Sequence, residues 1–323
     1  MRMIRKGIAL LAVFVLLWTA LSAIAEETED GQFPALNDAG FLDSGEFVFE
    51  DPENGVWRYA SDTLRVEIIR HQLTKPKKRV WYEAEVFCAE GSDGPRMVAN
   101  DPEHWKLPGN MDYPHKIARK NGVVLALSSD FAQLRIQQKN RRPGIIIRDR
   151  KVWSDSTKKQ GSKTFPNLDC LAIWPDGDMK VYGSDEKTAD EYLEDGAADV
   201  LAFGPVLIRD GKLNEEALDK YGTSHAQRTA VGMAEKGHYW FMMLEGRIRR
   251  SSGDGIRFLA EKLYEKGCTV GFNLDGGETS CIVFMGHQLN KLTDGKKNKG
   301  SRRTSDILGV GHSDLLPAVS DPF

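Results

Sequence analysis

The sequence lacks the short motifs of several large enzyme classes. It contains no Walker A sequence, no GxGxxG, no HExxH and no GxSxG, and its seven histidines show no close pairing at metal-ligand spacing. These motifs place phosphate-binding amides, zinc ligands or a nucleophilic serine where the chemistry needs them. Their absence leaves nucleotide-binding proteins, zinc proteases and serine hydrolases of these types without support.

Cysteine is scarce as well. The chain has four cysteines and no CxxC pair, namely Cys88, Cys170, Cys268 and Cys281. Without a CxxC pair we expect no zinc site. Four cysteines are compatible with two disulfides in an oxidising compartment. Three of them lie in apolar segments, so free buried thiols are an equal alternative.

The chain also has no large excess of positive or negative charge. The formal net charge is −3, with 41% hydrophobic and 28% charged residues over 323 positions. A nearly neutral chain gives no electrostatic reason to expect nucleic acid or an anionic membrane surface as its partner. The composition is that of a soluble globular protein with room for a sizeable core.

The first 25 residues have the pattern of a secretory signal peptide. Three basic residues precede an apolar stretch over residues 8–21, and Ala23-Ile24-Ala25 supplies the small side chains that a signal peptidase needs. The alternative is an uncleaved anchor, because the apolar segment is nearly as long as the roughly 20 residues that cross a bilayer. Both interpretations predict a secreted or extracytoplasmic protein. Its membrane contact would be confined to an uncleaved N-terminal segment.

Strand patterns outnumber helix patterns in the rest of the chain. Residues 26–44 are acidic and predict a linker, and residues 45–323 predict a single large domain. Tight turns between apolar runs, such as Pro175-Asp176-Gly177-Asp178, favour hairpins. The expected fold class is therefore α+β, with mixed, largely antiparallel sheets and a few flanking helices. The helices are expected at 114–120, 188–194 and 256–266, and the main strands at 64–69, 80–88, 123–127, 143–149, 151–155, 168–174, 179–182, 200–208, 228–233, 239–244, 268–274 and 281–285.

The stretch from Phe272 to Ser280 is the first candidate for a functional site. It places Asp275, Gly276 and Gly277 between two expected strands, and two hydroxyl residues follow closely. Glycines permit positive φ and allow the backbone to approach a ligand. A carboxylate at the end of a buried strand is then displayed in a loop, where chemistry is often found. The alternative is a tight hairpin in which Asp-Gly serves only as the turn.

A second candidate follows the apolar run Val123–Leu127. Ser128, Ser129 and Asp130 come directly after this expected strand. Small polar residues and a carboxylate at a strand end can belong to a site. Ser and Asp are also good helix N-caps, so capping of a following helix is the alternative.

Several ordered blocks resemble the phosphodiester glycosidase family. Asn273–Gly277 is similar to the family's most recognisable block, and Arg228–Gly232 to its Arg-Thr-Ala-Ile-Gly block. Further similar blocks are Ala126–Phe131, Ala202–Pro205 with Asp210–Lys212, and Glu245–Arg247. The resemblance runs from about residue 64 to residue 310, and five ordered blocks are more specific than any one of them.

The chain departs from the family pattern at four of these positions. Glu278 replaces a third glycine and Thr279 a serine, while Ser128 replaces an asparagine and Glu245 an aspartate. These departures bear on the substrate rather than on the fold.

The resemblance implies a secreted hydrolase that cleaves the glycosyl–phosphate bond of a sugar-1-phosphodiester. Its partner would be a sugar-phosphate diester or phosphorylated glycan, in glycan or exopolysaccharide metabolism. An oxocarbenium-like transition state calls for carboxylates near the ring and for positive charge on the phosphate. We therefore expect Asp275 as the main catalytic carboxylate, with Glu245 or Asp130 as its partner.

The phosphate is assigned to Arg228, because a guanidinium offers a planar fork to two phosphate oxygens. An ion pair between a surface Arg228 and a nearby carboxylate is the alternative. The other expected binding residues are Thr229, Gly276, Gly277, Thr279 and Ser280.

Metal use and turnover are left open by the sequence. Acidic side chains with hydroxyls also suit Ca²⁺ or Mg²⁺, so such a cation is an option with no assigned ligands. A secreted glycan-binding protein without turnover is one alternative function, since fold does not fix function. The other is a metal-dependent phosphodiesterase that cuts the P–O bond.

Overall fold

The computed structural model describes residues 31–105, 110–130, 144–156, 168–221, 224–294 and 301–316. The signal peptide expected over residues 1–25 lies outside these ranges. None of the helices within them is long and apolar enough to cross a membrane.

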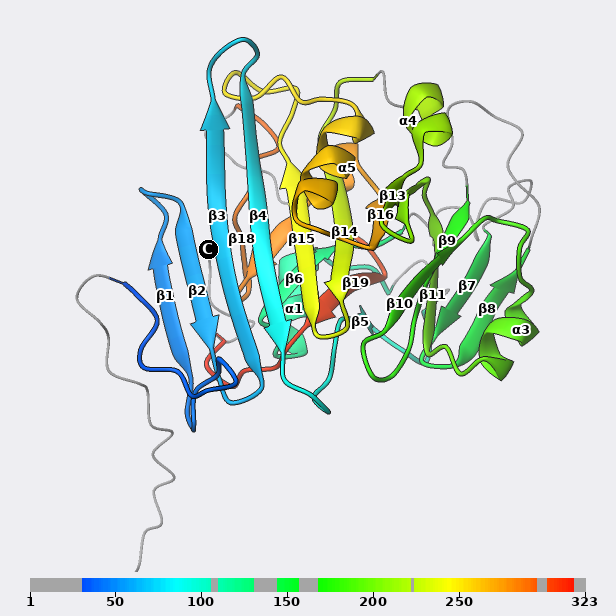
Figure 1. The fold of residues 1–323 in the computed structure, drawn as a ribbon, viewed down its shortest axis with the longest axis horizontal. Helices are drawn as coiled ribbons and strands as arrows, with labels where there is room; N and C mark the ends of the chain where they lie inside the picture. The colour runs from blue at the N-terminus through cyan, green and yellow to red at the C-terminus, as the bar shows by residue number, and fades with distance from the viewer. Residues whose placement is uncertain are drawn as a thin grey trace, which may run out of the picture.

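The largest element is a nine-stranded sheet, seen face-on in Figure 1, with the order β1-β2-β3-β4-β15-β14-β16-β12-β13. All of its strand pairings are antiparallel. The strands are β1 Phe47–Asp51, β2 Val56–Ala60, β3 Leu64–Leu73, β4 Arg79–Cys88, β15 His238–Leu244, β14 Arg228–Glu235, β16 Val270–Leu274, β12 Val206–Arg209 and β13 Lys212–Leu213.

Two five-stranded antiparallel sheets complete the β structure. One has the order β10-β9-β11-β7-β8, and we call it the β9 sheet; the other has the order β18-β17-β6-β19-β5, and we call it the β6 sheet. Their strands are β7 Ile145–Arg148, β8 Lys151–Asp155, β9 Asp169–Ile173, β10 Met179–Tyr182 and β11 Asp199–Phe203, and then β5 Arg96–Ala99, β6 Leu125–Ser128, β17 Ile282–Phe284, β18 His287–Gln288 and β19 Asp306–Val310.

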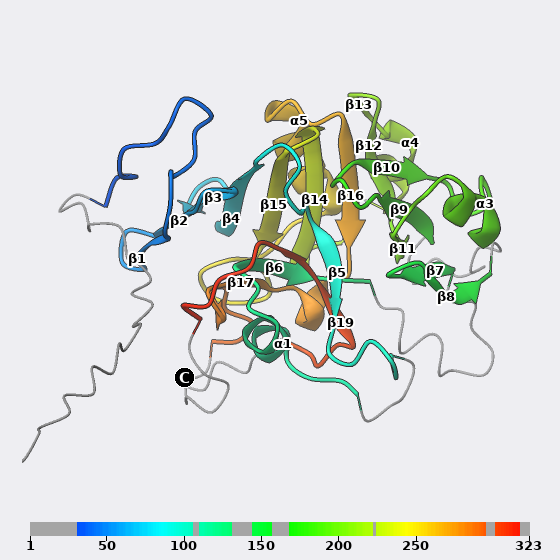
Figure 2. The same cartoon turned by 90° about the horizontal axis from the view of Figure 1, so that it is seen from below.

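Four α-helices flank the sheets in the described part of the chain, with one short 3₁₀ turn. They are α1 Pro114–Lys120, α3 Ala189–Glu194, α4 Glu215–Tyr221 and α5 Ile256–Glu265, and the 3₁₀ turn is η1 Gly277–Thr279. In Figure 2, α5 covers one face of the nine-stranded sheet, while the β6 sheet lies against the opposite face with α1 beyond it. The nine-stranded sheet is therefore the middle layer.

Both faces of the middle layer are buried. On the α5 side, Leu259 and Leu263 pack in one cluster with Met242. On the other side, Phe272 packs in a larger cluster with Leu127 of the β6 sheet. Each fully buried side chain of this size contributes roughly 2 kcal/mol, so both packings hold the central strands in place.

The predicted α+β class with largely antiparallel sheets is confirmed. Helix α1 occupies the predicted residues 114–120, and α3 and α5 form at the predicted positions. The predicted hairpins β7–β8, β9–β10 and β14–β15 form as well. These elements carry their signals locally, in turn residues and in apolar spacing.

The hairpin alternative for the Asp275 stretch is wrong. Strand β16 before it belongs to the nine-stranded sheet, whereas β17 after it belongs to the β6 sheet. The stretch is thus a crossover between two layers, and Asp275-Gly276-Gly277 is not a hairpin turn.

Residues 31–44, from the expected linker, pack on the outer end of the large sheet. Phe41 and Leu42 are buried, and the Phe33 ring lies against that of Phe47, with centroids 6.1 Å apart. The Leu42 N–H donates to the carbonyl of Ser61 at 2.9 Å.

All four cysteines carry free thiols. Cys88 is half-buried and the other three are buried. Burial raises the pKa of each thiol to about 12. Of the two alternatives, free buried thiols are the ones that form.

Candidate active site

Three of the family-like blocks meet at one edge of the nine-stranded sheet. Strand β14 begins with Arg228, which pairs with Leu244 at the end of β15. Its next residue, Thr229, pairs with Leu274 at the end of β16. The blocks that follow β15 and β16 therefore emerge beside the start of β14.

Asp275, Gly276 and Gly277 run alongside Gln227 and Arg228. The Gly277 N–H donates to the Gln227 carbonyl at 3.0 Å. A Cβ on Gly276 would lie 2.9 Å from that carbonyl oxygen and 3.7 Å from the Arg228 Nη1. Glycine is needed at position 276, because any side chain would press on this backbone and stand against the guanidinium.

The two glycines thus matter because they allow this backbone conformation. The Gly277 N–H is already engaged by Gln227, and Gly277 has a φ of 64°, a region that favours glycine. No described atom comes within 4 Å of a Cβ built on Gly277. The crossover is therefore open to a ligand on this side.

The β6 sheet holds Asp275 from the other side. The Asp275 N–H donates to the Ser129 carbonyl at 3.1 Å, and the Ser128 hydroxyl donates to the Asp275 carbonyl at 3.1 Å. The side chain of Asp275 is largely buried, with 9% of the residue exposed. The two candidate stretches of the sequence are thus neighbours in space.

Arg228 is held by two backbone carbonyls and by the Ser224 hydroxyl, which accepts from its Nη2. Its Nη2 donates to the Ser224 carbonyl at 2.7 Å, and its Nε donates to the Asp254 carbonyl at 3.3 Å. The ion-pair alternative for Arg228 is not seen among the described residues. Its Nη1 faces Gly276. Among the described residues this nitrogen has no hydrogen-bond acceptor, so it can donate to a ligand.

A second guanidinium lies near Arg228. Burial lowers the pKa of Arg228 and the charge of Arg247 lowers it further, while Asp254 acts in the opposite direction. Arg247 is exposed and adopts a φ of 58°, which is unusual for a residue with a Cβ. Two neighbouring cationic side chains suit an anionic ligand.

Four buried polar atoms on these segments lack a hydrogen-bond partner within the described ranges. They are the Oε1 of Gln227, the Oγ1 of Thr229, the Oγ1 of Thr279 and the Oγ of Ser280. Buried polar groups almost always have a partner. A hydroxylated or anionic ligand at this edge would provide it.

Asp130 is tied to a buried arginine. Its Oδ2 accepts from Arg148 Nη2 at 3.2 Å and from the Ala202 N–H at 3.1 Å. Arg148 also donates through Nε to Asp306 at 2.7 Å, and Asp306 accepts from the hydroxyl of Ser129. This network positions the Ser128–Asp130 segment that contacts Asp275.

Glu245 is tied to another arginine. It is fully buried and accepts two hydrogen bonds from Arg250 and one from the Lys291 N–H at 2.7 Å. Burial by itself would lower the pKa of Arg250, but its hydrogen bond and charge interaction with Glu245 outweigh this and raise it. Such a saturated carboxylate is suited to a structural role.

Asn273 connects the same edge to the Gly204–Pro205 block. Its Nδ2 donates to the Gly204 carbonyl at 2.8 Å, and the bond between Gly204 and Pro205 is cis. Strand β12 begins directly after this block. All five sequence blocks therefore contribute to one region.

The departure at Glu278 does not fill this region. Its side chain is 79% exposed and pairs with Arg302, with Nη2 and Oε2 3.4 Å apart. No group of three or more His, Cys, Asp or Glu side chains that could hold a metal ion occurs among the described residues.

Sequence reasoning missed Arg247, Gln227 and the arginine partners of Asp130 and Glu245. Arg247 carried a signal, because it closes the Glu245–Arg247 block. Arg148 carried none, because its contacts to Asp130 and Asp306 join segments far apart in the sequence.

Comparison with known proteins identifies a family for the chain. A model of the phosphodiester glycosidase family matches residues 121–311. The SPbeta prophage-derived uncharacterized protein YomE of Bacillus subtilis (strain 168) is 28% identical over 173 residues, which are 53% of this chain and 26% of that protein. The chain thus corresponds to about a quarter of that relative's length.

Solved structures show the same fold. The zebrafish N-acetylglucosamine-1-phosphodiester alpha-N-acetylglucosaminidase catalytic domain, auto-inhibited by its pro-peptide, has a TM-score of 0.61 at 18% identity, over 78% of this chain and 85% of that one. A hypothetical protein from Synechocystis has a TM-score of 0.50 at 10% identity, over 77% of this chain and 62% of that one. The family match spans more than half of the chain and contains every block of the candidate site, so the chain belongs to the phosphodiester glycosidase family.

Proposed function

We propose that this protein hydrolyses the glycosyl–phosphate bond of a sugar-1-phosphodiester. One observation carries the proposal. Asp275 follows the end of β16 and lies next to the start of β14 with Arg228, and Gly276, which has no side chain, leaves room beside the Nη1 of that guanidinium.

The two groups suit the two halves of the reaction. Positive charge builds up at the anomeric carbon as its bond to the phosphate oxygen lengthens, and a nearby carboxylate stabilises that charge. The bonding electrons pass to the phosphate oxygen, where the guanidinium of Arg228 stabilises them. Water supplies the new anomeric hydroxyl, and the products are a free sugar and a phosphomonoester.

Arg247 takes part in holding the phosphate. Burial is the main cause of the lowered pKa of Arg228, and the nearby charge of Arg247 lowers it further. A phosphate between them removes this repulsion and gains charge-assisted hydrogen bonds. In this proposal the hydroxyls of Thr229, Thr279 and Ser280, which lack a hydrogen-bond partner among the described residues, bind further ligand oxygens.

Asp130 and Glu245 have supporting roles in this proposal. Each carboxylate is fixed by an ion pair with a buried or half-buried arginine. A carboxylate held in this way has little freedom to transfer protons. Asp275 is then the carboxylate that faces the reacting carbon, as nucleophile or as general base.

Hydrolysis of UDP-N-acetylglucosamine and simple sugar-1-phosphodiesters tests the proposal. The mature protein is compared with Asp275→Asn and Arg228→Ala. We expect release of free sugar, with a loss of at least about a hundredfold in kcat/KM in either variant, since catalytic carboxylates and phosphate clamps contribute on this scale. Activity that survives both substitutions would place the site elsewhere.

Two further arms separate the alternatives. In ¹⁸O-labelled water, label in the sugar marks C–O cleavage, whereas label in the phosphate marks a phosphodiesterase that cuts the P–O bond. No turnover across a broad sugar panel, with and without divalent cations, would favour a glycan-binding protein.

We also propose that the protein works outside the cytoplasm, on glycan or exopolysaccharide. The basic and apolar pattern of residues 1–25 supports this location. Cell fractionation with N-terminal sequencing of the recovered protein tests it. A chain that keeps Met1 and is found in the cytoplasm would contradict it.

A further inference from the structure

Positive charge is concentrated on one surface of the molecule, although the chain as a whole has a formal net charge of −3. The surface is formed by residues 75–79, at the turn from β3 into β4, and by residues 245–254, which follow β15. These two segments together contain seven lysines and arginines but only two carboxylate side chains. We call this surface the basic face.

Direct contacts join the two segments of the basic face. Both the N–H and the hydroxyl of Ser252 donate to the Lys78 carbonyl at 3.0 Å. The Val80 N–H donates to the hydroxyl of Ser251 at 3.1 Å. The cationic side chains of the two segments therefore belong to one continuous surface.

The two carboxylates of these segments lie beneath the basic face. Glu245 is fully buried and pairs with Arg250. The side chain of Asp254 is 18% exposed and pairs with Lys77 at 3.2 Å and with Arg79 at 2.6 Å. The carboxylates thus neutralise the half-buried cations and leave the exposed ones uncompensated.

Four cationic side chains of the basic face are exposed, namely Lys75, Lys78, Arg247 and Arg249. None of them has an ion-pair partner in the part of the chain that the structure describes. The exposed carboxylate of Asp294 accepts from the Arg249 N–H at 2.9 Å and offsets one of the four charges. The outward charge of the basic face is therefore positive.

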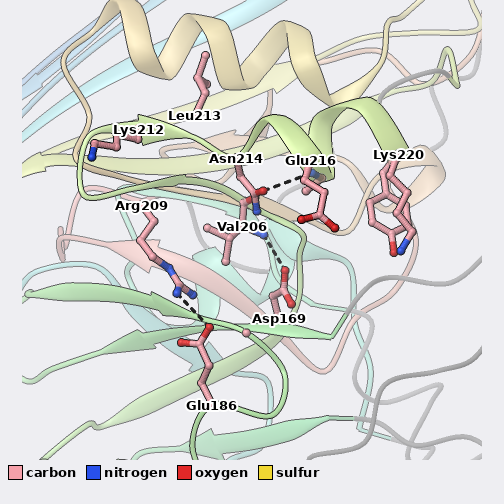
Figure 3. A pocket seen from close by; sticks show the side chains of 12 residues that line it. Asp169, Glu186, Val206, Arg209, Lys212, Leu213, Asn214, Glu216 and Lys220 are labelled. Carbon is pink, nitrogen blue, oxygen red and sulfur yellow. Dashed lines mark hydrogen bonds and ion pairs between the residues drawn. The ribbon is translucent and has the colours of Figure 1, made fainter.

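The cavity between the β9 sheet and the segment from β12 to α4 provides a contrast (Figure 3). Three cationic and three anionic side chains line this cavity of about 460 Å³. Arg209 and Glu186 face each other there as an ion pair at 3.0 Å. Uncompensated positive charge is thus a property of the basic face and not of every polar surface of the molecule.

The turn between β3 and β4 also exposes apolar side chains. It projects beyond the neighbouring strands of the large sheet (Figure 1). Leu73 at the end of β3 is 40% exposed, and Ile69, which lies on the same side of the strand, is 36% exposed. A soluble polyanion would leave these side chains in water. A lipid surface would remove them from water, which is favourable.

The basic face lies at the opposite end of β3 from the start of the described chain. Phe47 and Arg65 both pair with Ala60, so β1 begins level with the first residues of β3. Lys75 follows the other end of this ten-residue strand. A contact through the basic face therefore does not require the N-terminal segment.

We propose that the basic face binds the surface of a membrane that contains anionic lipids. Lys75 and Lys78 contact the headgroups, and Leu73 enters the boundary between the headgroups and the acyl chains. The candidate site adjoins this contact, because Arg247 belongs to the basic face and Arg228 Nε donates to the Asp254 carbonyl. Membrane binding goes beyond the proposed function and is measured without turnover.

Co-sedimentation with lipid vesicles tests this inference. The mature protein, which begins after residue 25, is mixed with phosphatidylcholine vesicles that either contain or lack phosphatidylglycerol. We expect binding only when phosphatidylglycerol is present, and weaker binding as salt screens the charges. Lys75→Ala with Lys78→Ala should lower the partition coefficient roughly 25-fold, because each basic residue near an anionic surface contributes a factor of about five. Leu73→Ser should lower it several-fold, through the loss of apolar contact.

The matched control is Lys151→Ala with Lys180→Ala, which removes the same charge from exposed positions of the β9 sheet. We expect its partition coefficient to be unchanged, and urea unfolding shows that each variant is folded. Equal binding to both kinds of vesicle, no binding to either, or equal binding by the Lys75/Lys78 variant and the control would overturn the inference. Binding of inorganic polyphosphate without binding to vesicles would assign the basic face to a soluble polyanion instead. Vesicle binding by a protein that hydrolyses no diester would support this inference and refute the proposed function.

Discussion

At the residue scale, Arg247 combines backbone strain with a place close to Arg228. Its φ of 58° lies in the left-handed region, which costs a residue with a Cβ roughly 1–2 kcal/mol. The side chain is exposed and its charge disfavours that of Arg228. Strained residues of this kind cluster at functional sites, which agrees with the proposed role of Arg247 in binding phosphate.

Replacing Arg247 by glycine should therefore separate stability from function. We expect the free energy of unfolding of Arg247→Gly to be unchanged or raised by up to about 1 kcal/mol, because backbone strain is relieved. We expect its kcat/KM for a phosphodiester to fall at least tenfold, because a charge-assisted hydrogen bond is lost. Urea unfolding and steady-state kinetics measure the two effects.

The control for this prediction is Arg249→Gly, since Arg249 is a nearby exposed arginine of the same segment. Arg247→Ala separates the side chain from the backbone effect, because alanine keeps the strain and loses the charge. Full activity in both Arg247 variants would remove this residue from the phosphate site.

At the scale of elements, the site depends on strand ends from two sheets. Ser129 directly follows β6 and its carbonyl accepts from Asp275, while its hydroxyl donates to Asp306 at the start of β19. Arg148 at the end of β7 joins Asp306 and Asp130. Three strands therefore fix the crossover that carries Asp275.

Removing the Ser129 hydroxyl should weaken this support. We expect Ser129→Ala to lower kcat about tenfold with little change in KM, and to lower stability by roughly 2 kcal/mol, the scale of a buried hydrogen bond to a charged group. Ser61→Ala is the matched control, because Ser61 is also buried and accepts turn hydrogen bonds on β2–β3. A loss of stability with unchanged kcat well below Tm would reduce Ser129 to a purely structural role.

Glu83 holds α5 to the nine-stranded sheet. It lies on β4, accepts from Trp81 Nε1 at 2.8 Å, and pairs with Lys266 at the end of α5 at 2.9 Å. Burial opposes ionisation, but hydrogen bonds from His71, Trp81 and Lys266 prevail and lower the pKa of Glu83 to about 2. The ionised form is therefore favoured by folding.

The sign of the resulting pH dependence follows from the depressed pKa. Above pH 4.5, the ordinary pKa, ionised Glu83 makes its full contribution to the free energy of unfolding. This contribution is lost as the pH falls from 4.5 towards 2. This amounts to roughly 3 kcal/mol at most. Urea unfolding between pH 5 and pH 2 should show a shallower loss in Glu83→Gln than in the wild type, with Glu85→Gln as the control on the same strand. Parallel curves for Glu83→Gln and the wild type would contradict the assignment.

At the scale of the whole molecule, local sequence signals predict many of the helices and strands but little of how the strands pair into sheets. Helix α1 was predicted to the residue because Pro114 and Asn121-Gly122 bracket it. Helix α4 was missed, since its seven residues contain four charged ones and only two that are buried. Strands β5 and β19 were missed because they pair with each other across about 200 residues.

The residues of the candidate site were predicted from the sequence only in part. The blocks around Asp275 and Arg228 were found because their residue types and order are visible in the sequence. The adjacency of these two residues is a property of the register between β14 and β16. The arginine partners Arg148 and Arg250, which fix Asp130 and Glu245, depend on packing that no short pattern records.

The whole molecule also holds together without disulfides. Its four cysteines are free, and burial suppresses their ionisation by raising each thiol pKa to about 12. Because the thiolate is the reactive form, a thiol reagent at pH 8 should react slowly with the native protein and titrate four thiols after denaturation. A reductant should leave Tm unchanged, since no covalent link constrains the unfolded chain. Titration of two thiols or none after denaturation, together with a Tm that falls on reduction, would show instead that bridges form when the protein matures outside the cytoplasm.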